Sequence, residues 1–147
     1  MYKNILVPTD GSALSRRIIR DAAQFAAKLG AKITGIYVAP TYRVEVYTDF
    51  VPPDIMTPEQ HNASAQKTAQ RFLETVKKAA AENRVAYAGE YVMGDDPAEA
   101  MVKIAQKRKC DLIYMGSHGR SGLSKLLLGS QTSNVLAHSR VPVLVHR

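Results

Sequence analysis

The order of apolar segments constrains the fold of this chain more than any other feature. Short apolar runs, typical of buried strands, alternate with segments in which apolar residues recur every three or four positions, as in amphipathic helices. The runs cover residues 3–10, 32–40, 85–93, 111–116 and 141–147, and the helical segments cover 12–30, 57–83, 96–109 and about 130–139. This alternation predicts an α/β fold, with a single open five-stranded parallel sheet and helices on both faces.

Residues at the ends of the helical segments match the preferences of helix termini. Ser12 or Ser15 can cap the first helix, and Gly30 supplies a stop at its other end. Thr57 and Asp96 each precede a proline, which is favoured at the first position of a helix. These signals support the helical segments read from the apolar pattern.

Length and charge limit the classes of partner. The chain of 147 residues shows no repeat and no linker, so we expect a single domain over residues 1–147. Its 20 basic and 13 acidic residues give a net charge of +7. The basic residues are spread along the helical segments, and their one run of three, at 107–109, has no aromatic residues between them. An anionic small ligand is therefore a better expectation than nucleic acid.

Cysteine content and hydropathy bear on the compartment. Cys110 is the single cysteine, so no internal disulfide can form, which suits the reducing cytoplasm. Its position before an apolar run predicts a buried thiol. The first residues lack the pattern of a signal peptide, and no window approaches the roughly 18 apolar residues of a membrane helix. We therefore expect a cytoplasmic protein without a membrane anchor.

A glycine-rich loop follows the fourth apolar run. Its glycines stand as Gly116-x2-Gly119-x9-Gly129-Ser130, and the last helical segment begins at Ser130. Glycine lets the backbone approach a ligand closely and permits positive φ, so that successive N–H groups can converge on an anion. A helix N-terminus adds free N–H donors and a partial positive charge, and the hydroxyls of Ser130 and Thr132 add further donors. The pattern indicates a phosphate site, with a merely flexible turn as the alternative.

Two commoner phosphate motifs do not match this loop. A P-loop requires glycine, lysine and then serine or threonine where this chain has Ser124, Lys125 and Leu126. A dinucleotide fingerprint belongs after the first strand, where this chain has TDGSAL. The loop therefore belongs to neither of these classes.

Unusual residues also follow the first apolar run, as Pro8-Thr9-Asp10. Open parallel sheets bind ligands beyond the carboxyl ends of their strands, where the strand order reverses. Pro8-Thr9-Asp10 and the glycine loop would share one pocket in a sheet of order 3-2-1-4-5. The clustering of these residues favours that order, although the residues alone do not establish it.

Taken together, these motifs resemble the universal stress protein family. The glycine spacing, PTDGS after the first strand, and the segments MGSHGRSG and LLGSQTSNVLAHSRVPVLV are close to the usual sequences of that family, and the likeness covers the whole chain. The resemblance implies a Rossmann-like sheet of order 3-2-1-4-5, of the adenine nucleotide alpha hydrolase type. Because all the motif glycines are present, it also implies the ATP-binding branch of the family.

The resemblance further implies roles for individual residues. Asp10 would contact the ribose, or a Mg²⁺ ion held by the phosphates of ATP, AMP or ADP, and Val38 would contact adenine. His118 is also interpretable as a loop residue that holds the turn. The implied nucleotide-binding set comprises Pro8, Thr9, Asp10 and Val38 on the nucleoside side, Met115 and Gly116 beside the ribose, Ser117, His118 and Arg120 between these points, and Gly119, Gly129, Ser130, Gln131 and Thr132 at the phosphates.

Nucleotide binding and nucleotide turnover are two different functions, and the residues favour binding. We expect an ATP-binding regulatory protein of the stress response, acting as a nucleotide-dependent switch or sensor. A slow ATPase or phosphotransferase is the alternative, although no paired carboxylates lie near the glycine loop. A phospho-accepting receiver domain is disfavoured, because no aspartate stands directly at the end of the third run and no lysine ends the fifth.

Residues 39–56 form a long connection for a compact domain, and loops of this length are commonly functional. The segment carries tyrosines, a phenylalanine and three prolines. A lid over the pocket, an arm on a partner and a flap over the second helix are equally open interpretations.

The last apolar run predicts a homodimer. In the order 3-2-1-4-5 the strand within Val141 to Arg147 lies at an edge of the sheet, where uncovered backbone groups promote aggregation. Antiparallel pairing with a second copy would cover this edge, and the family resemblance implies the same contact. A monomer whose edge is shielded by residues 39–56 is the alternative. A proline at Leu144 is expected to disrupt the pairing and also to loosen the fold.

Overall fold

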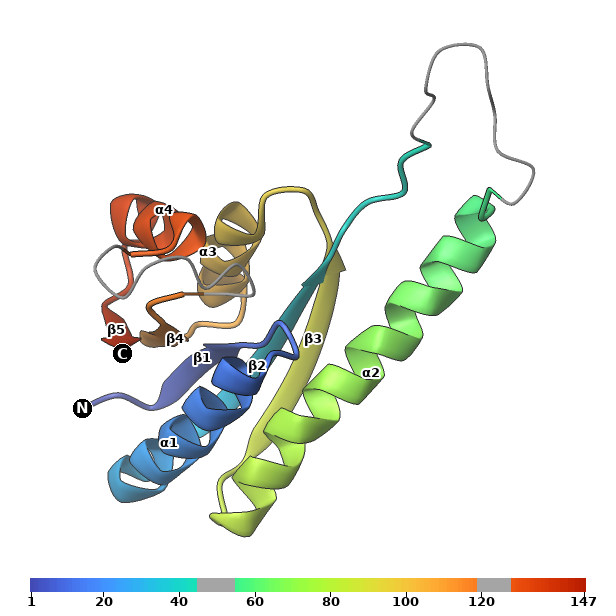
Figure 1. Cartoon of the computed structure of the whole chain (residues 1–147). Helices are drawn as coiled ribbons and strands as arrows, with labels where there is room; N and C mark the ends of the chain where they lie inside the picture. The colour runs from blue at the N-terminus through green and yellow to red at the C-terminus, as the bar shows by residue number, and fades with distance from the viewer. Residues whose placement is uncertain (45–54, 119–127) are drawn as a thin grey trace.

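The computed structural model describes residues 1–44, 55–118 and 128–147, which form one parallel sheet with helices on both faces. The strands are β1 (Asn4–Pro8), β2 (Lys32–Ala39), β3 (Tyr87–Met93), β4 (Leu112–Gly116) and β5 (Val143–His146). They follow the order β3-β2-β1-β4-β5 (Figure 1). The predicted order 3-2-1-4-5 is therefore confirmed, and β1 and β4 are neighbours.

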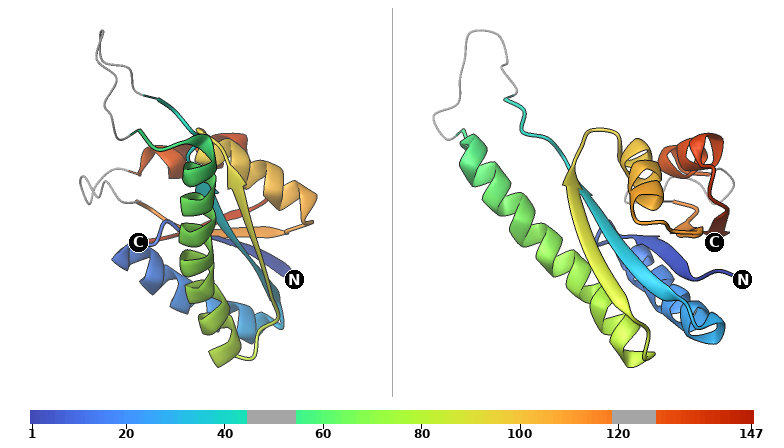
Figure 2. Two further views of the ribbon diagram at one scale, coloured as in Figure 1. Left: turned by 90° about the vertical axis from the view of Figure 1, so that its right-hand side faces the viewer. Right: turned by 180° about the vertical axis from the view of Figure 1, so that it is seen from behind.

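The helices divide between the two faces of the sheet. Their bounds are α1 (Ala13–Leu29), α2 (Pro58–Glu82), α3 (Pro97–Lys107) and α4 (Ser130–His138). The first two cover one face and the last two cover the other, as the views in Figure 2 also show. Successive residues of a strand pack on opposite faces of the sheet. Ile5 and Val7 of β1 pack under α1 and α2, while Leu6 packs under α3 and α4. Burial on both faces explains why the central strands β1 and β4 read as continuous apolar runs.

The helix starts follow the predicted capping signals. Ser12 rather than Ser15 is the N-cap of α1, and its Oγ accepts from the N–H of Ser15 at 3.0 Å. Thr57 forms a reciprocal capping box with Gln60 at the start of α2, and Asp96 caps α3. Each cap satisfies backbone donors that a helix leaves open at its N-terminus.

The boundaries differ from the predicted ones by one or two residues at most ends. The first run was predicted over 3–10, but β1 ends at Pro8, so Thr9 and Asp10 belong to the turn that follows. Cys110 is buried, as expected. The described residues include no helix that is both long and apolar enough to cross a membrane. Within the predicted long connection, residues 45–54 lie outside the described part of the chain.

Candidate functional site

A cavity of about 400 Å³ opens beyond the carboxyl ends of β1, β2 and β4, where the strand order reverses. The starts of α1, α3 and α4 complete its walls. It is lined by Pro8, Thr9, Asp10, Ser15, Ile18, Ile36, Tyr37, Val38, Pro97, Met101, Met115, Gly116, His118, Gly129, Ser130, Gln131 and Thr132. The two groups of unusual residues that the sequence places after separate strands thus meet in one cavity.

All the predicted nucleotide-binding residues that the structure describes, except Ser117, line this cavity. Ser117 is 5% exposed and joins backbone segments instead. Its N–H donates to the carbonyl of His146 at 2.8 Å, and its carbonyl accepts from the N–H of Gly129 at 2.7 Å. Gly119 and Arg120 lie outside the described residues. Ser117 therefore supports the cavity from behind rather than lining it.

The turn after β1 is fixed by side chains that accept from its backbone. Thr9 is 7% exposed, and its Oγ1 accepts from the N–H of Gly11 at 3.3 Å. Asp10 accepts from the N–H of Ser12 at 2.9 Å through Oδ1. Gly11 has a φ of 74°, and a Cβ there would lie 2.2 Å from the ring of Phe72. Only glycine suits that position, and the resulting turn holds Asp10 at the rim of the cavity.

The start of α4 differs from the starts of the three other helices. Its N-cap is Gly129, and no side chain among the described residues caps it. As in α1, its first turn holds no acidic residue. The backbone N–H of Ser133 donates to the carbonyl of Gly129 at 2.9 Å, which closes the first helical turn. The three residues before Ser133 donate no backbone hydrogen bond within the helix and line the cavity: Ser130, Gln131 and Thr132. Their backbone donors give the cavity one electropositive end.

The side chains of two of these residues are engaged with the rest of the protein. Thr132 is 2% exposed, and its hydroxyl donates to the carbonyl of Gly116 at 2.8 Å. Gln131 accepts from the N–H of Ala98 at 3.0 Å, which ties the start of α4 to the start of α3. The hydroxyl hydrogen of Thr132 is therefore already used, and this residue can offer a ligand its backbone N–H.

Two of the motif glycines, Gly116 and Gly129, do not use the positive φ that glycine permits. Among the described glycines, Gly11 and Gly30 have positive φ, whereas Gly129 has a φ of −62°. At Gly116 the missing side chain matters for space, because a Cβ would lie 2.4 Å from Cδ1 of Ile18. Glycine keeps this end of β4 open to the cavity.

Residues that the sequence analysis did not assign form most of the apolar wall. Pro97 could have been found, because it stands at a helix start that follows a strand end, as Ser130 does. Ile18 and Met101 belong to the apolar stripes of α1 and α3, where nothing in the pattern separates a cavity residue from a core residue. The unassigned lining residues are Ser15, Ile18, Ile36, Tyr37, Pro97 and Met101.

Charged side chains contribute little to the described lining. Asp10 is the one carboxylate, and no lysine or arginine of the described residues takes part. His118 contacts the hydroxyl of Ser117 through Nδ1 at 2.9 Å, and its buried Nε2 has no partner among the described residues. These residues also contain no group of three or more acidic, histidine or cysteine side chains that could hold a metal. The cavity thus combines an apolar part with the electropositive start of α4.

Comparison with known proteins agrees with this architecture. The universal stress protein MJ0531 of Methanocaldococcus jannaschii is 36% identical over 145 residues, covering 99% of this chain and 82% of that protein. The structure of MJ0577 from the same organism matches with a TM-score of 0.81 at 30% identity, covering 99% of this chain and 95% of that one. A universal stress protein solved in complex with cAMP matches with a TM-score of 0.72 at 27% identity, covering 99% and 97%.

The family assignment rests on the full length of the chain. The universal stress protein family matches residues 1–147. The two solved relatives are similar over nearly all of their own length, and the strand order is the one that the resemblance implied. This chain belongs to the universal stress protein family.

Proposed function

We propose that this protein is a cytoplasmic ATP-binding regulator of the stress response, in which bound nucleotide acts as a switch. Family membership supports the stress-response role, and a relative solved with cAMP supports an adenine nucleotide as the ligand class. The observation that carries the proposal is the start of α4, whose first turn has no side-chain cap among the described residues and lines a cavity that also has a large apolar wall.

The phosphates would lie at the start of α4. Ser130, Gln131 and Thr132 present backbone donors there, and the helix end adds partial positive charge. Gly119 and Arg120, which the resemblance also implies at this end, belong to the proposal as well. A triphosphate would thus supply the acceptors that side chains supply at the other helix starts.

The base would lie between the end of β2 and the start of α3. Val38, Pro97 and Met101 give this side of the cavity an apolar character. The backbone of Val38 can hydrogen-bond an adenine edge, and no described carboxylate on this side faces a guanine edge. We therefore expect ATP to be preferred over GTP in a competition titration.

Asp10 would serve as the protein ligand of Mg²⁺. A single carboxylate fits this ion, because Mg²⁺ in nucleotide sites is commonly held by one or two carboxylates together with phosphate oxygens and water. The turn after β1 fixes Asp10 at the cavity rim. Bound Mg²⁺ would neutralise phosphate charge, and Asp10 would orient the ion.

The site is better suited to holding a nucleotide than to cleaving it. Phosphoryl transfer requires a placed base or water-orienting group and usually cationic charge on the γ-phosphate. The described lining offers one carboxylate and neither lysine nor arginine. We accordingly propose regulation by occupancy rather than by turnover.

Two measurements test the proposal. Mass spectrometry of nucleotide released from the denatured, freshly purified protein identifies what the site holds, and calorimetry with ATP and Mg²⁺ measures affinity. Absence of both a co-purified adenine nucleotide and measurable ATP binding would refute the proposal. Release of ADP by the unmodified protein, lost in Asp10→Ala, would instead favour a slow ATPase.

We also propose that the protein forms a homodimer through β5, which lies at an edge of the sheet. The hydrogen bonds of β5 to β4 use the carbonyls of Pro142 and His146. Because successive residues of a strand direct their backbone groups to opposite sides, Val143 and Val145 face the open edge. Leu144 faces β4, so Leu144→Pro would break the sheet of the monomer itself and does not isolate the dimer contact.

Val145→Pro is the sharper test of the dimer. It removes an N–H from the open edge and leaves the bonds between β5 and β4 in place. Sedimentation at tens of micromolar should give a dimer mass for the unmodified protein and a monomer mass for Val145→Pro. A monomer mass for the unmodified protein would refute the dimer.

A further inference from the structure

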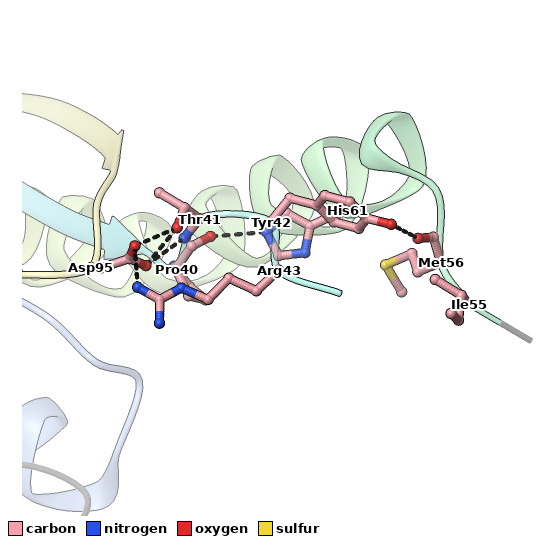
Figure 3. A pocket seen from close by; sticks show the side chains of 8 residues that line it. All are labelled: Pro40, Thr41, Tyr42, Arg43, Ile55, Met56, His61 and Asp95. Atoms are coloured by element: carbon pink, nitrogen blue, oxygen red, sulfur yellow. Dashed lines mark hydrogen bonds and ion pairs between the residues drawn. The ribbon is translucent and has the colours of Figure 1, made fainter. Parts of the chain in front are cut away.

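The carboxylate of Asp95, between β3 and α3, holds the chain segment that leaves β2. Its oxygens accept from the hydroxyl of Thr41 at 2.6 Å, from the N–H of Thr41 at 3.2 Å, and from the guanidinium of Arg43 at 2.6 Å (Figure 3). Hydrogen bonds from Thr41, and next from Arg43, hold the pKa of Asp95 below its usual value. Two segments that the sequence separates by about fifty residues are thus joined at one side chain.

The same segment is also held from the side of α2. The ring Nε2–H of His61 donates to the carbonyl of Pro40 at 2.8 Å, and the Tyr42 hydroxyl donates to the carbonyl of Met56 at 2.7 Å. The rings of Tyr42 and His61 meet edge to face, with centroids 5.6 Å apart. Figure 3 shows these contacts side by side with the Asp95 cluster. Residues 40–43 therefore have fixed partners on both sides.

The Asp95 cluster lies next to the base side of the nucleotide cavity. Val38, two residues before Pro40, lines the cavity, as does Pro97, two residues after Asp95. The ladder between β2 and β3 ends close by, where the N–H of Gly94 donates to the carbonyl of Ala39 at 2.8 Å. Beyond that bond, the Asp95 contacts join the segment after β2 to the loop that leads into α3.

We propose that Asp95 is a positioning residue for the nucleoside part of the ligand. By clamping Thr41 to the loop that leads into α3, it sets the gap between Val38 and Pro97, into which the base would fit. The inference rests on the proposed function, because it concerns the same cavity. An isolated surface ion pair such as Arg43–Asp95, with side chains 71% and 41% exposed, would contribute little. Asp95 also accepts from both the backbone N–H and the hydroxyl of Thr41, so its contribution does not depend on the ion pair alone.

The experiment compares three ligands in Asp95→Ala and in the unmodified protein. Calorimetry with ATP, with adenosine and with inorganic triphosphate separates the base side from the phosphate side. ATP and adenosine should weaken together by about threefold to tenfold, while inorganic triphosphate binds as before. A general loss of structure would weaken all three, so the split between ligands reports positioning rather than stability.

Two further variants complete the test. Asp95→Asn keeps an acceptor for Thr41 and should lose less affinity than Asp95→Ala, which also keeps the test decisive if the alanine variant fails to fold. Glu99→Gln breaks an exposed 2.7 Å ion pair with Lys103 on the neighbouring helix α3 and should change nothing. Unchanged adenosine and ATP affinity in Asp95→Ala, or an equal loss for triphosphate, overturns the inference alone. Failure of the unmodified protein to bind any adenine nucleotide overturns the proposed function, and this inference with it.

Discussion

The starts of α2 and α4 differ in how their first backbone N–H groups find hydrogen-bond acceptors. At α2, Thr57 accepts from the N–H of Gln60 at 3.2 Å, and the Gln60 side chain accepts from the N–H of Thr57 at 2.8 Å. Pro58 follows, and the acidic Glu59 lies in the first turn. At α4 the N-cap is Gly129, without a side-chain cap or an acidic residue among the described residues. The first N–H groups of α2 have acceptors within the helix start. Those of α4 have no side-chain acceptor among the described residues.

The difference matches the proposed position of the phosphates rather than any need of the helix. In Figure 1, α2 begins away from the sheet, beyond the end of β2. The first residues of α4 line the cavity. A capping side chain adds stability where no ligand approaches. At the start of α4, where we propose the phosphates, it would occupy the place of an anion. Adding a cap to α4 and removing the cap of α2 therefore separates the requirements of folding from those of binding.

The largest effect is expected when α4 receives a cap of its own. Gly129 has a φ of −62° and a ψ of 153°, close to the values of Ser12 and Thr57 at the capped starts, so a larger residue fits the backbone. In Gly129→Asp, the carboxylate would occupy the free donors and repel phosphate. ATP affinity should fall roughly 100-fold, equivalent to about 2.7 kcal/mol. Thermal unfolding without nucleotide should show a gain of about 0.3–1 kcal/mol.

Gly129→Asn is the matched control, because asparagine caps a helix nearly as well without carrying charge. It should weaken ATP less than Gly129→Asp does, and the gap between the two variants measures the charge repulsion. ATP affinity that stays at the unmodified level in both would mean that the phosphates do not lie at the start of α4.

A smaller loss of ATP affinity is expected from Ser130→Ala, which tests a single side chain at the start of α4. Ser130 lines the cavity, and its hydroxyl can donate to a charged phosphate oxygen. Loss of one such bond should cost about 1.5 kcal/mol, or roughly a tenfold loss of ATP affinity. Ser133→Ala is the control, because Ser133 lies on the same helix but does not line the cavity. Calorimetry that finds equal affinities in the two variants would remove Ser130 from the phosphate site.

Much of the fold could be predicted because strands and helices here carry clear periodic signals. The capping residues Thr57 and Asp96 marked two helix starts correctly, since side-chain caps depend only on neighbouring residues. The strand order was less accessible, because it depends on contacts between distant segments. It came from the family resemblance and from the chemistry at two strand ends.

The cavity was predicted in part, and the gaps have physical reasons. Residues at strand ends, such as Thr9 and Gly116, stood out because polar and glycine residues there break an apolar pattern. Ile18 did not stand out, since its side chain serves the core and the cavity at once. Asp95 was also missed, because its importance comes from Thr41, a partner that no local pattern reveals. Only the three-dimensional structure supplies such pairs.

The smallest effect on binding is expected from removing the cap of α2. Thr57→Ala removes the hydroxyl that accepts from the N–H of Gln60, which is one half of the capping box, and should cost about 1 kcal/mol of stability, seen as a lowering of Tm by roughly 2–4 °C. ATP affinity should not change, because no described residue of α2 lines the cavity. Gln60→Ala, which removes the other half of the same box, should behave alike. If either variant weakened ATP as much as Ser130→Ala, the helix starts would not divide into one for folding and one for binding, and the contrast between α2 and α4 would fail.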